Sequence, residues 1–483
     1  MALPTKKTKI VCTIGPASQD QETLEQMLLM GMNVARLNFA HGDFESHAQV
    51  VENLRAAAHS TGKRVAIMGD LPGPKMRIGK LVEEPLTLEH GQSFILQTEE
   101  ILGDDQRVSL SFNSLPEVVA PGDLIYINDG FIQLEVHNVA GDQVICEVQV
   151  GGELRSFKGV NFPGIDLGIG AFTDHDLEFL KFAAQHGLDA VGQSFVQGPE
   201  DIIAVRAAAK ALDYHPFIIA KIERAKALDN LDAILEVTDG IMVARGDLGV
   251  EIPIETMAIT QKNIIRQANI YGKPVITATQ MLESMVIHPR PTRAEATDVA
   301  NAILDGTDCV MLSGETAMGG FPVEAVTMMA CIARETEPYV SVPDVARLLH
   351  EAKKSGEISK PDLISLSIFL TVEAVNTVAV MTPTLSGATA RRVARFRPPV
   401  WIIAVSPNES ACQGLQFSYG VHAIYERERP ESWQVYSRTW LNDHSFTKGL
   451  AILTHGAGTA HGGGTNQIEI IDLDRPLDDI HVW

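Results

Sequence analysis

The amino-acid sequence predicts an α/β protein: a (β/α)8 TIM barrel with an inserted β-barrel lid domain and a C-terminal open α/β domain. Two observations predict the barrel. Eight short apolar runs form strand-then-helix units, and polar side chains gather at the downstream ends of these runs. In a (β/α)8 barrel those ends form one face, where the chemistry takes place. A third observation, the alternating pattern within residues 71–165, predicts the insertion.

The barrel strands are rich in Val, Ile and Ala without strict alternation, which is typical of strands buried on both faces. They are expected at 9–15, 33–39, 65–70, 189–195, 216–222, 240–245, 274–279 and 309–314. Stretches 20–30 and 174–185 are amphipathic at helical spacing, with Ser18 and Thr173 as their expected caps.

The third strand ends near Asp70, but its helix starts only near Thr173. The intervening runs alternate apolar and polar residues and are separated by turns, which indicates strands at 86–99, 123–129, 131–139 and 143–154. We therefore expect the barrel to comprise residues 1–70 and 166–340, and the inserted all-β lid to comprise 71–165.

A polar connector at 351–360 leads into a further α/β pattern, which predicts a C-terminal domain at 355–483. Its five expected strands are 378–382, 400–406, 421–426, 450–455 and 468–473. A chain of 483 residues is long enough for about three such domains.

Composition restricts the partners and the location. A formal charge of −22 argues against nucleic acid, and no apolar run reaches the roughly 18 residues needed to span a membrane. The chain starts without an apolar core of signal-peptide length. Its five scattered cysteines form no CxxC pair and are typical of reduced thiols, so we expect a cytoplasmic protein.

The strand ends carry a set of charged and hydroxyl side chains: Arg36, Asn38, His41, Asp70, Ser194, Lys221, Glu223, Arg245, Asp247, Thr279 and Glu315. Glu223 and Asp247 follow adjacent strands, and such a carboxylate pair, with waters and a substrate oxygen, usually holds Mg²⁺. Lys221 lies two residues before Glu223, so both point to the same side of the strand. A lysine beside a divalent metal suits a phosphoryl group.

Further positive groups complete this set. Gly246 sits at a tight turn after a strand, where a helix start would offer N–H groups to a carboxylate or phosphate. Arg36 and Arg77 add guanidinium forks. Taken singly, strand-end Asp or Arg residues more often cap helices or pair with each other. Their joint placement at one rim favours phosphoryl transfer, which needs positioning and electrostatics more than covalent chemistry.

These residues lie in motifs that resemble the pyruvate kinase family over the whole chain. The motifs are CTIGPAS at 12–18, GMNVARLNFAHG at 31–42, KGVNFPG at 158–164, IAKIE at 219–223, ARGDLG at 244–249, TATQMLESM at 277–285 and PTRAEATDVANAILDGTDCVMLSGETA at 291–317. The resemblance implies transfer of the phosphoryl group of phosphoenolpyruvate to ADP, giving pyruvate and ATP, in the last step of glycolysis. It also implies a homotetramer.

The resemblance assigns roles by position. Glu223 and Asp247 match the ligands of Mg²⁺, or of Mn²⁺ in its place. The matched catalytic residues are Lys221, Arg36, Thr279 and Arg77, although either Thr279 or a water chain would protonate the enolate. The matched substrate-binding residues are Arg36, Lys221, Gly246, Asp247, Thr279 and Ser194. The matched nucleotide-binding residues are Asn38, His41, Arg77, Lys158 and Asp129, with Asp129 in a lid that closes over the site.

One departure from the family concerns K⁺. Many members bind K⁺ through Asn, Ser, Asp and Thr with a nearby Glu, and the aligned residues here are Asn38, Ala40, Asp70, Leu71 and Lys75. Ala40 and Leu71 have no side-chain oxygen, and Lys75 replaces the Glu. A tethered ammonium would supply the charge of the bound ion, so we expect an enzyme that does not require K⁺. The alternative is that Lys75 is a solvent-facing loop lysine.

A second departure concerns regulation. Residues 384–392 follow a strand and open a helix, and they offer a phosphate the donors of Thr384, Ser386, Gly387 and Thr389. Relatives regulated by fructose 1,6-bisphosphate carry Lys and Arg in this loop, where Leu385 and Ala388 stand here. We therefore expect a sugar monophosphate or AMP as effector. A plain helix start without a ligand is the alternative.

Two other functions stay open at this point. A Mg²⁺-dependent barrel lyase of pyruvate-like acids would use a similar carboxylate pair, but it has no need of a β lid or of Arg77 and Lys158. A non-catalytic metabolite sensor on the same scaffold would bind an effector without turnover, although every catalytic position matched above is intact.

Overall fold

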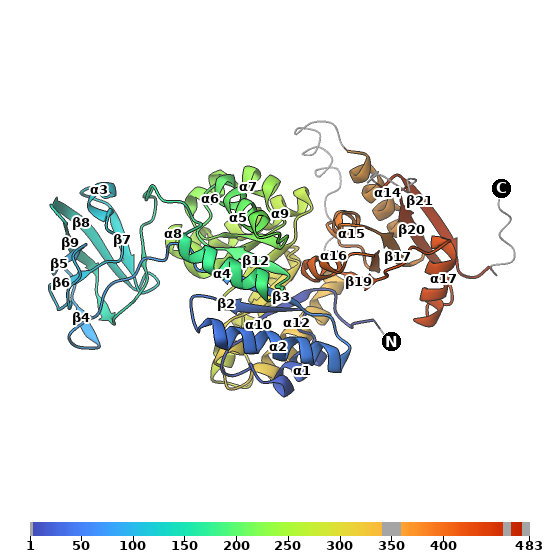
Figure 1. The fold of residues 1–483 in the computed structure, drawn as a ribbon, viewed down its shortest axis with the longest axis horizontal. Coiled ribbons are helices and arrows are strands. Elements are labelled where there is room, and N and C mark those ends of the chain that lie inside the picture. The colour runs from blue at the N-terminus through green and yellow to red at the C-terminus, as the bar shows by residue number, and fades with distance from the viewer. Residues whose placement is uncertain (1–2, 341–358, 457–464, 476–483) are drawn as a thin grey trace.

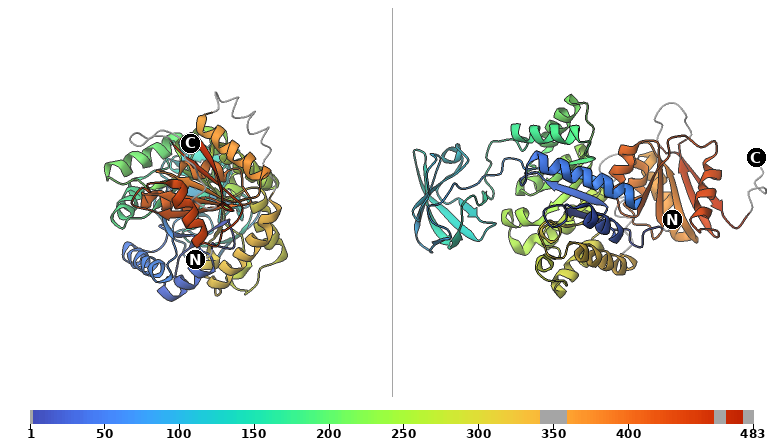
Figure 2. Two further views of the ribbon diagram at one scale, coloured as in Figure 1. Left: turned by 90° about the vertical axis from the view of Figure 1, so that its right-hand side faces the viewer. Right: turned by 60° about the horizontal axis from the view of Figure 1, so that its bottom comes forward.

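The computed structural model describes residues 3–340, 359–456 and 465–475. The molecule is elongated, with the β lid at one end, the barrel in the middle and the C-terminal α/β domain at the other end (Figures 1 and 2). Most of the predicted connector at 351–360, and with it the expected start of the C-terminal domain, lies outside the described residues.

Eight parallel strands close into the predicted barrel, in the order β1-β16-β15-β14-β13-β12-β3-β2. They are β1 (Lys9–Thr13), β2 (Val34–Asn38), β3 (Ala66–Leu71), β12 (Ala190–Gln193), β13 (Phe217–Ile222), β14 (Gly240–Ala244), β15 (Val275–Ala278) and β16 (Cys309–Leu312). Their residues are almost all buried because alternate side chains fill the barrel interior or pack against the surrounding helices. The predicted fold class is confirmed.

Helices cover the barrel on the outside (Figure 1). They are α1 (Gln21–Met30), α2 (Phe44–Thr61), α4 (Asp174–Gln185), α5 (Pro199–Ala211), α6 (Ala225–Asp229), α7 (Leu231–Val237), α8 (Arg245–Glu251), α9 (Met257–Tyr271), α10 (Arg293–Leu304), α11 (Gly314–Ala317) and α12 (Pro322–Thr336). Short 3-10 turns are η1 (Ile254–Thr256), η2 (Glu283–Val286) and η3 (Glu337–Tyr339).

The two predicted caps have different outcomes. Thr173 caps α4 through a capping box in which it exchanges hydrogen bonds with Asp176. The prediction of Ser18 for α1 is wrong: Asp20 is the cap, and its carboxylate accepts a hydrogen bond from the Thr23 amide. Ser18 is buried and its amide bonds to the Gly15 carbonyl, so it belongs to the preceding loop.

The insertion between β3 and α4 is an all-β unit with its own apolar core. It contains β4 (Leu86–Leu88), β5 (Ser93–Gln97), β6 (Arg107–Ser109), β7 (Leu124–Ile127), β8 (Ile132–Ala140), β9 (Gln143–Val150), β10 (Gly152–Leu154), β11 (Val160–Asn161) and the short helix α3 (Leu115–Val118). Six strands form one sheet, β11-β7-β8-β9-β5-β6, and β10 pairs with β4. Arg77 forms an isolated bridge with Gly159, next to edge strand β11, and Ile78 forms one with Leu110, next to edge strand β6. The sheet therefore curls towards a barrel, but no continuous ladder of hydrogen bonds closes it.

The C-terminal domain is the predicted five-stranded sheet, in the order β19-β18-β17-β20-β21. The strands are β17 (Thr377–Pro383), β18 (Trp401–Ser406), β19 (Val421–Tyr425), β20 (Leu450–His455) and β21 (Gln467–Asp472), of which β21 is antiparallel to β20. The helices are α14 (Lys360–Ala374), α15 (Ala388–Ala394), α16 (Glu409–Gly414) and α17 (Trp433–Asp443), with η4 (Leu415–Phe417) before β19. No helix of the described chain combines the length and apolarity needed to span a bilayer.

Candidate active site

The ends of β2 and β3 bring a guanidinium and a carboxylate together. Arg36 donates from Nε to Oδ2 of Asp70 at 2.8 Å, and its Nη2 bonds to the same oxygen. Its Nη1 donates to the hydroxyl of Thr13, at the end of β1, at 3.0 Å. Arg36 is therefore fixed from two neighbouring strands before any ligand binds.

Lys221, on β13, lies at the centre of the site. Its Nζ is 2.8 Å from Oε1 of Glu223, 3.2 Å from Oδ2 of Asp70 and 2.6 Å from the hydroxyl of Ser194. Ser194 donates in turn to the Leu71 carbonyl at 2.7 Å, so its lone pairs face the ammonium. Burial alone would lower the pKa of Lys221, but Asp70 and Glu223 raise it above its ordinary value. Lys221 is thus a permanent cation rather than a proton donor.

Asp70 joins the two cations. Burial would raise the pKa of its carboxyl, but Arg36 and Lys221 together hold that pKa below its ordinary value. Its other oxygen, Oδ1, is buried without a hydrogen-bond partner among the described residues. Since both cations share Oδ2, the carboxylate sets the spacing between Arg36 and Lys221.

The carboxylate pair faces the same rim. Glu223 accepts a hydrogen bond from the Phe195 amide at 2.7 Å, and burial, with Asp247 adding to it, raises the pKa of Glu223. Two acidic groups that influence each other, one of them buried, favour a bound cation nearby. Within the described ranges no group of three His, Cys, Asp or Glu side chains could hold a metal. A two-carboxylate donor set fits Mg²⁺, which keeps water and substrate oxygens as its other ligands.

The predicted helix start after β14 is present, because α8 begins at Arg245. The Gly246 amide donates to the hydroxyl of Thr279, at the end of β15, at 3.0 Å. Thr279 therefore lies directly beside the turn that carries Asp247. Glu315 does not share this chemistry: it is fully buried and accepts from the amides of Leu282 and Ser313, so it joins two loops under the rim.

The predicted nucleotide-facing residues spread over the barrel rim and the lid junction. His41 is exposed; partial burial, then Arg77, Lys75 and Arg36, lower its pKa, so these cations lie on its side of the rim. Arg77 donates to the Phe157 carbonyl at 2.9 Å, and the Lys158 carbonyl accepts from Ile78.

Asp129 lies on the lid. It is exposed in the turn between β7 and β8 and does not join Glu223 and Asp247 in a group of metal-binding side chains within the described chain. The same turn reaches the barrel, because a Cβ on Gly130 would lie 3.5 Å from the side chain of Val250 in α8.

The residues aligned with the family's K⁺ site also lie at this rim. The Asn38 side chain accepts from the Ala40 amide at 3.3 Å, Leu71 is buried, and Asp70 is held by the two cations. Lys75 is exposed, and its Cε runs 3.4 Å from the position of a Cβ on Gly159. Its ammonium contributes positive charge on the His41 side of the site.

The predicted effector loop joins β17 to α15. Gly387 has a φ of +77°, and its amide donates to the Thr384 hydroxyl at 3.0 Å. The Ser386 carbonyl accepts from Arg391 at 3.0 Å, and the Thr389 hydroxyl lies 2.6 Å from that of Thr465. The loop is therefore ordered by its own side chains.

A cleft of about 490 Å³ opens between this loop and the base of the barrel. It is lined by Arg206 and Lys210 of α5 and by Leu385, Ser386 and Arg391 of the C-terminal domain, among others.

Two residues that contact the site could not be predicted from the spacing of residues in the sequence. Thr13 holds Arg36, and Asp298 of α10 pairs with Arg245 at 2.7 Å. Neither was expected, since each acts through a strand or helix distant in the chain. Thr13 lies within the motif at 12–18 and Asp298 within the motif at 291–317, but neither motif indicates the partner of these residues.

Comparison with protein families matches residues 5–326 to the pyruvate kinase barrel domain and residues 362–471 to the pyruvate kinase alpha/beta domain. The chain is 45% identical over 484 residues to the pyruvate kinase of Thermococcus litoralis, covering 98% of this chain and 100% of that relative. For the pyruvate kinase of Geobacillus stearothermophilus the identity is 42% over 478 residues, covering 96% and 80%. A crystal structure of a pyruvate kinase from Cryptosporidium parvum matches with a TM-score of 0.89 and 37% identity, covering 97% of this chain and 96% of that one.

Proposed function

The chain belongs to the pyruvate kinase family and is a phosphotransferase, and we propose that it is a K⁺-independent pyruvate kinase of glycolysis controlled by a monophosphate effector. The observation that carries the catalytic part is the chain of charges Arg36–Asp70–Lys221–Glu223 beside Asp247. The full-length match favours a kinase over the lyase and the non-catalytic sensor. We also propose a cytoplasmic location, in keeping with five free cysteines.

The proposed mechanism follows from the charges. Arg36 and Lys221 hold the phosphoryl group of phosphoenolpyruvate, and the amides at the start of α8 bind its carboxylate. An oxygen of ADP attacks the phosphorus, and the bond from phosphorus to the enol oxygen breaks. Lys221 stabilises the negative charge on the transferring phosphoryl group and on the enolate oxygen. The enolate carbon then gains a proton on the Thr279 side, from Thr279 or from water, which gives pyruvate.

Members of this family generally use Mg²⁺. Glu223 and Asp247 would hold it, or Mn²⁺ in its place, and the ion would supply Lewis-acid charge to phosphoryl and enolate oxygens. On the nucleotide side, His41, Arg77 and Lys158 would face the phosphates of ADP, with Asn38 beside them. Asp129 would approach when the lid closes and excludes water.

The K⁺ proposal is tested by pyruvate formation from phosphoenolpyruvate and ADP, coupled to lactate dehydrogenase, with Mg²⁺ in a tetramethylammonium buffer. We expect full activity without K⁺ and no increase on adding KCl, because Lys75 supplies the positive charge and Ala40 and Leu71 leave the ion without ligands. Activity that appears only after KCl would contradict the proposal, while the enzyme would remain a pyruvate kinase.

Replacing Lys75 by Glu should lower kcat by about tenfold or more, which corresponds to about 1.4 kcal/mol of lost transition-state stabilisation. Added KCl should not restore it, since two ligands are still missing. Lys80→Glu is the matched control: Lys80 is an exposed lysine five positions further along, and the change in net charge is identical. Wild-type kcat for Lys75→Glu would show that Lys75 is only a loop lysine.

The effector proposal rests on the loop and the cleft together. The loop offers the donors of Thr384, Ser386, Gly387 and Thr389 but no cation of its own at positions 385 and 388. Arg391 and Lys210 supply positive charge at the cleft, and no ion pair of Lys210 is found among the described residues. One phosphate can be neutralised there, whereas Leu385 and Ala388 provide no further cation for a second phosphate. This supports a sugar monophosphate or AMP over a bisphosphate.

We expect sugar monophosphates or AMP to lower the half-saturating phosphoenolpyruvate concentration, and fructose 1,6-bisphosphate to have little effect. Ser386→Asp should abolish the response, because it places a negative charge where the phosphate binds. Ser367→Asp, on the exposed face of α14, makes the same charge change elsewhere and should keep the response. A strong response to the bisphosphate alone would refute the proposal.

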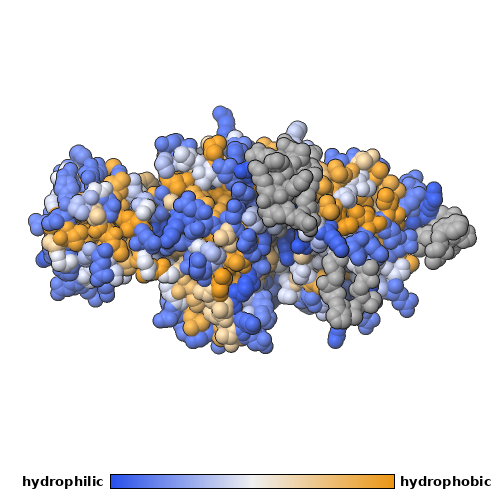
Figure 3. Space-filling view, turned by 90° about the horizontal axis from the view of Figure 1, so that it is seen from above, coloured by the Kyte–Doolittle hydropathy of each residue, from blue (hydrophilic) through white to orange (hydrophobic). Residues whose placement is uncertain are grey.

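Oligomerisation is proposed on the family likeness and on exposed apolar surface. Large side chains near α9 and η2 are exposed, namely Ile254 (71%), Ile259 (61%) and Ile287 (71%). Apolar patches are also visible on the barrel and the C-terminal domain in Figure 3. Patches of this kind mark protein contacts, and a homotetramer would bury them; sedimentation of the intact chain measures the assembly.

A further inference from the structure

The backbone of Thr279 has an unusual conformation. Its φ is +68°, and that of the next residue, Gln280, is +53°. Left-handed backbone is a genuine outlier for a β-branched residue, and such geometry persists only where surrounding contacts enforce it. The contacts that hold Thr279 therefore decide where its hydroxyl lies.

Arg245 supplies those contacts. Its Nη2 donates to the Thr279 carbonyl at 2.7 Å, and its Nε donates to the Ala278 carbonyl at 3.2 Å. The amide of Gly246, the next residue, donates to the Thr279 hydroxyl at 3.0 Å. The first two residues of α8 thus bind both the backbone and the side chain at the end of β15.

Arg245 is itself oriented from the opposite side. The carboxylate of Asp298 in α10 accepts from both terminal nitrogens of the guanidinium, with Nη1 to Oδ1 at 2.8 Å and Nη2 to Oδ2 at 2.7 Å. Gln261 of α9 accepts from Nη1 at 3.4 Å. A planar fork with five donors can satisfy a carboxylate and two carbonyls at once, which a lysine cannot do.

We propose that Arg245, oriented by Asp298, is a positioning residue that fixes the Thr279 hydroxyl relative to the turn carrying Asp247. The inference rests on the proposed function, in which the enolate is protonated on the Thr279 side. Because Arg245 and Asp247 lie in one helical turn, the same residue links the metal-binding carboxylate to the protonation side. Arg245 does not touch the substrate in this scheme.

The test separates protonation from phosphoryl transfer. The Mg²⁺-loaded enzyme is measured in two assays: pyruvate formation from phosphoenolpyruvate and ADP, and exchange of the methyl hydrogens of pyruvate with D2O in the presence of ATP. Exchange involves only removal and return of a proton at the methyl carbon, without phosphoryl transfer. Its rate therefore measures the protonation step that we place at Thr279. Thermal unfolding of each variant is recorded as a check on folding.

Arg245→Lys should lower the exchange rate and kcat by about 100-fold, as expected for a reacting group displaced by about 1 Å, while KM for phosphoenolpyruvate changes less than threefold. Asp298→Asn should lower both by about tenfold, because an amide still accepts one bond. Arg55→Lys is the matched control: Arg55 also binds a carbonyl, that of Gly187, and a carboxylate, that of Asp189, but away from the site. It should leave both rates unchanged.

Equal losses for Arg245→Lys and Arg55→Lys, or a higher KM with wild-type exchange, would overturn the inference. Thr279→Val is measured in parallel. If it exchanges as fast as the wild type, Thr279 is not the group that Arg245 must hold, and the inference fails while the kinase assignment stands. A wild-type enzyme that forms no pyruvate would instead refute the proposed function itself.

Discussion

Replacing Lys221 by Met is expected to lower kcat by about a thousandfold, the upper range for loss of one preorganised charge at a reacting oxygen. Lys221 is buried between Asp70 and Glu223, and these carboxylates raise its pKa, so the charge is present throughout the neutral range. Methionine keeps the apolar stem but leaves the transferring phosphoryl group without this cation. Steady-state kinetics in saturating Mg²⁺ measure the effect.

The same replacement leaves Glu223 without its lysine, so folding has to be measured separately. Asp70 keeps Arg36, and Glu223 keeps the Phe195 amide, so we expect a folded protein with a lower melting temperature. Lys226→Met is the control, because Lys226 forms only an exposed pair with Asp166. A folded Lys221→Met enzyme with more than a tenth of wild-type kcat would show that Lys221 is structural.

Much of the barrel could be predicted because each strand is a short, mostly apolar run whose polar residues fall near its downstream end. β13 (Phe217–Ile222) lies within the run expected at 216–222, and the residues after it fall at the rim by topology alone. The placement of Glu223 and Asp247 after neighbouring strands followed from the same rule, since parallel neighbours end at the same edge. Local periodicity therefore gave the fold class and the position of both carboxylates after neighbouring strands.

Pairs between distant elements could not be predicted in this way. Arg245 and Asp298 are 53 residues apart, and Arg397 and Asp308 are 89 apart, with no spacing rule to connect them. The prediction of the α1 cap was wrong because Ser18 and Asp20 are both good capping residues, and tertiary packing buries the first. Periodicity shows which face is buried, but the partner of a buried charge depends on packing.

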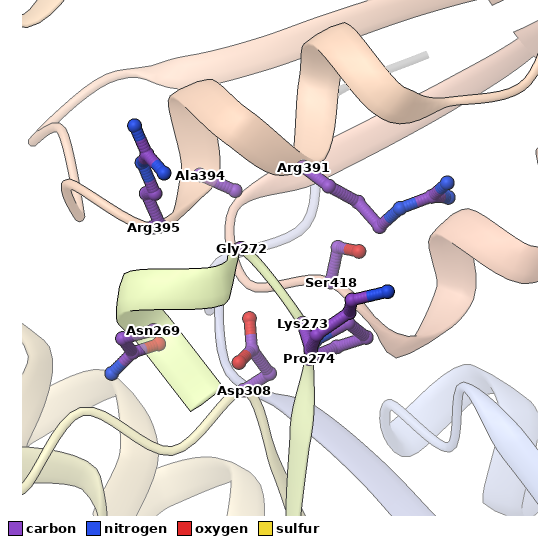
Figure 4. Close-up of a pocket in the computed structure, with 9 residues that line it drawn as sticks. All are labelled: Asn269, Gly272, Lys273, Pro274, Asp308, Arg391, Ala394, Arg395 and Ser418. Carbon is purple, nitrogen blue, oxygen red and sulfur yellow. The ribbon is translucent and has the colours of Figure 1, made fainter. Parts of the chain in front are cut away.

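Replacing Asp308 by Ala is expected to destabilise the junction of the barrel and the C-terminal domain by about 3–5 kcal/mol, the usual result of leaving a buried charge unpaired. Asp308 lies before β16 in the pocket drawn in Figure 4. Its carboxylate accepts from both Nη atoms of Arg397, at 3.1 and 3.0 Å. It also accepts from the Tyr419 amide at 2.9 Å and the Val275 amide at 3.1 Å. The change leaves Arg397 without its counter-ion, although its guanidinium keeps the Gly306 carbonyl and the Asn269 side chain, and it removes the side-chain acceptor of two amides.

Urea unfolding followed by tryptophan fluorescence measures this directly, since Trp401, Trp433, Trp440 and Trp483 all lie in the C-terminal part of the chain. Circular dichroism reports on all domains together, and the two midpoints are compared because a multidomain chain need not unfold in one step. Asp166→Ala removes an exposed ion pair and should change the midpoints little. In the double variant Asp308→Ala/Arg397→Met, the loss of unfolding free energy should be smaller than the sum of the losses in the two single variants. Additive losses would contradict the pairing.

The position of Asp308 also predicts the order in which the C-terminal domain and the barrel unfold in urea. Its carboxylate holds the amide of Val275, the first residue of β15, while Thr279 follows the last residue of the same strand. The C-terminal domain is thus attached to the end of β15 that lies away from the site. In Asp308→Ala the tryptophan transition should come at lower urea than the loss of pyruvate formation, because the domain detaches before the strand unfolds. Simultaneous loss of both signals would mean that the barrel depends on this ion pair for its own stability.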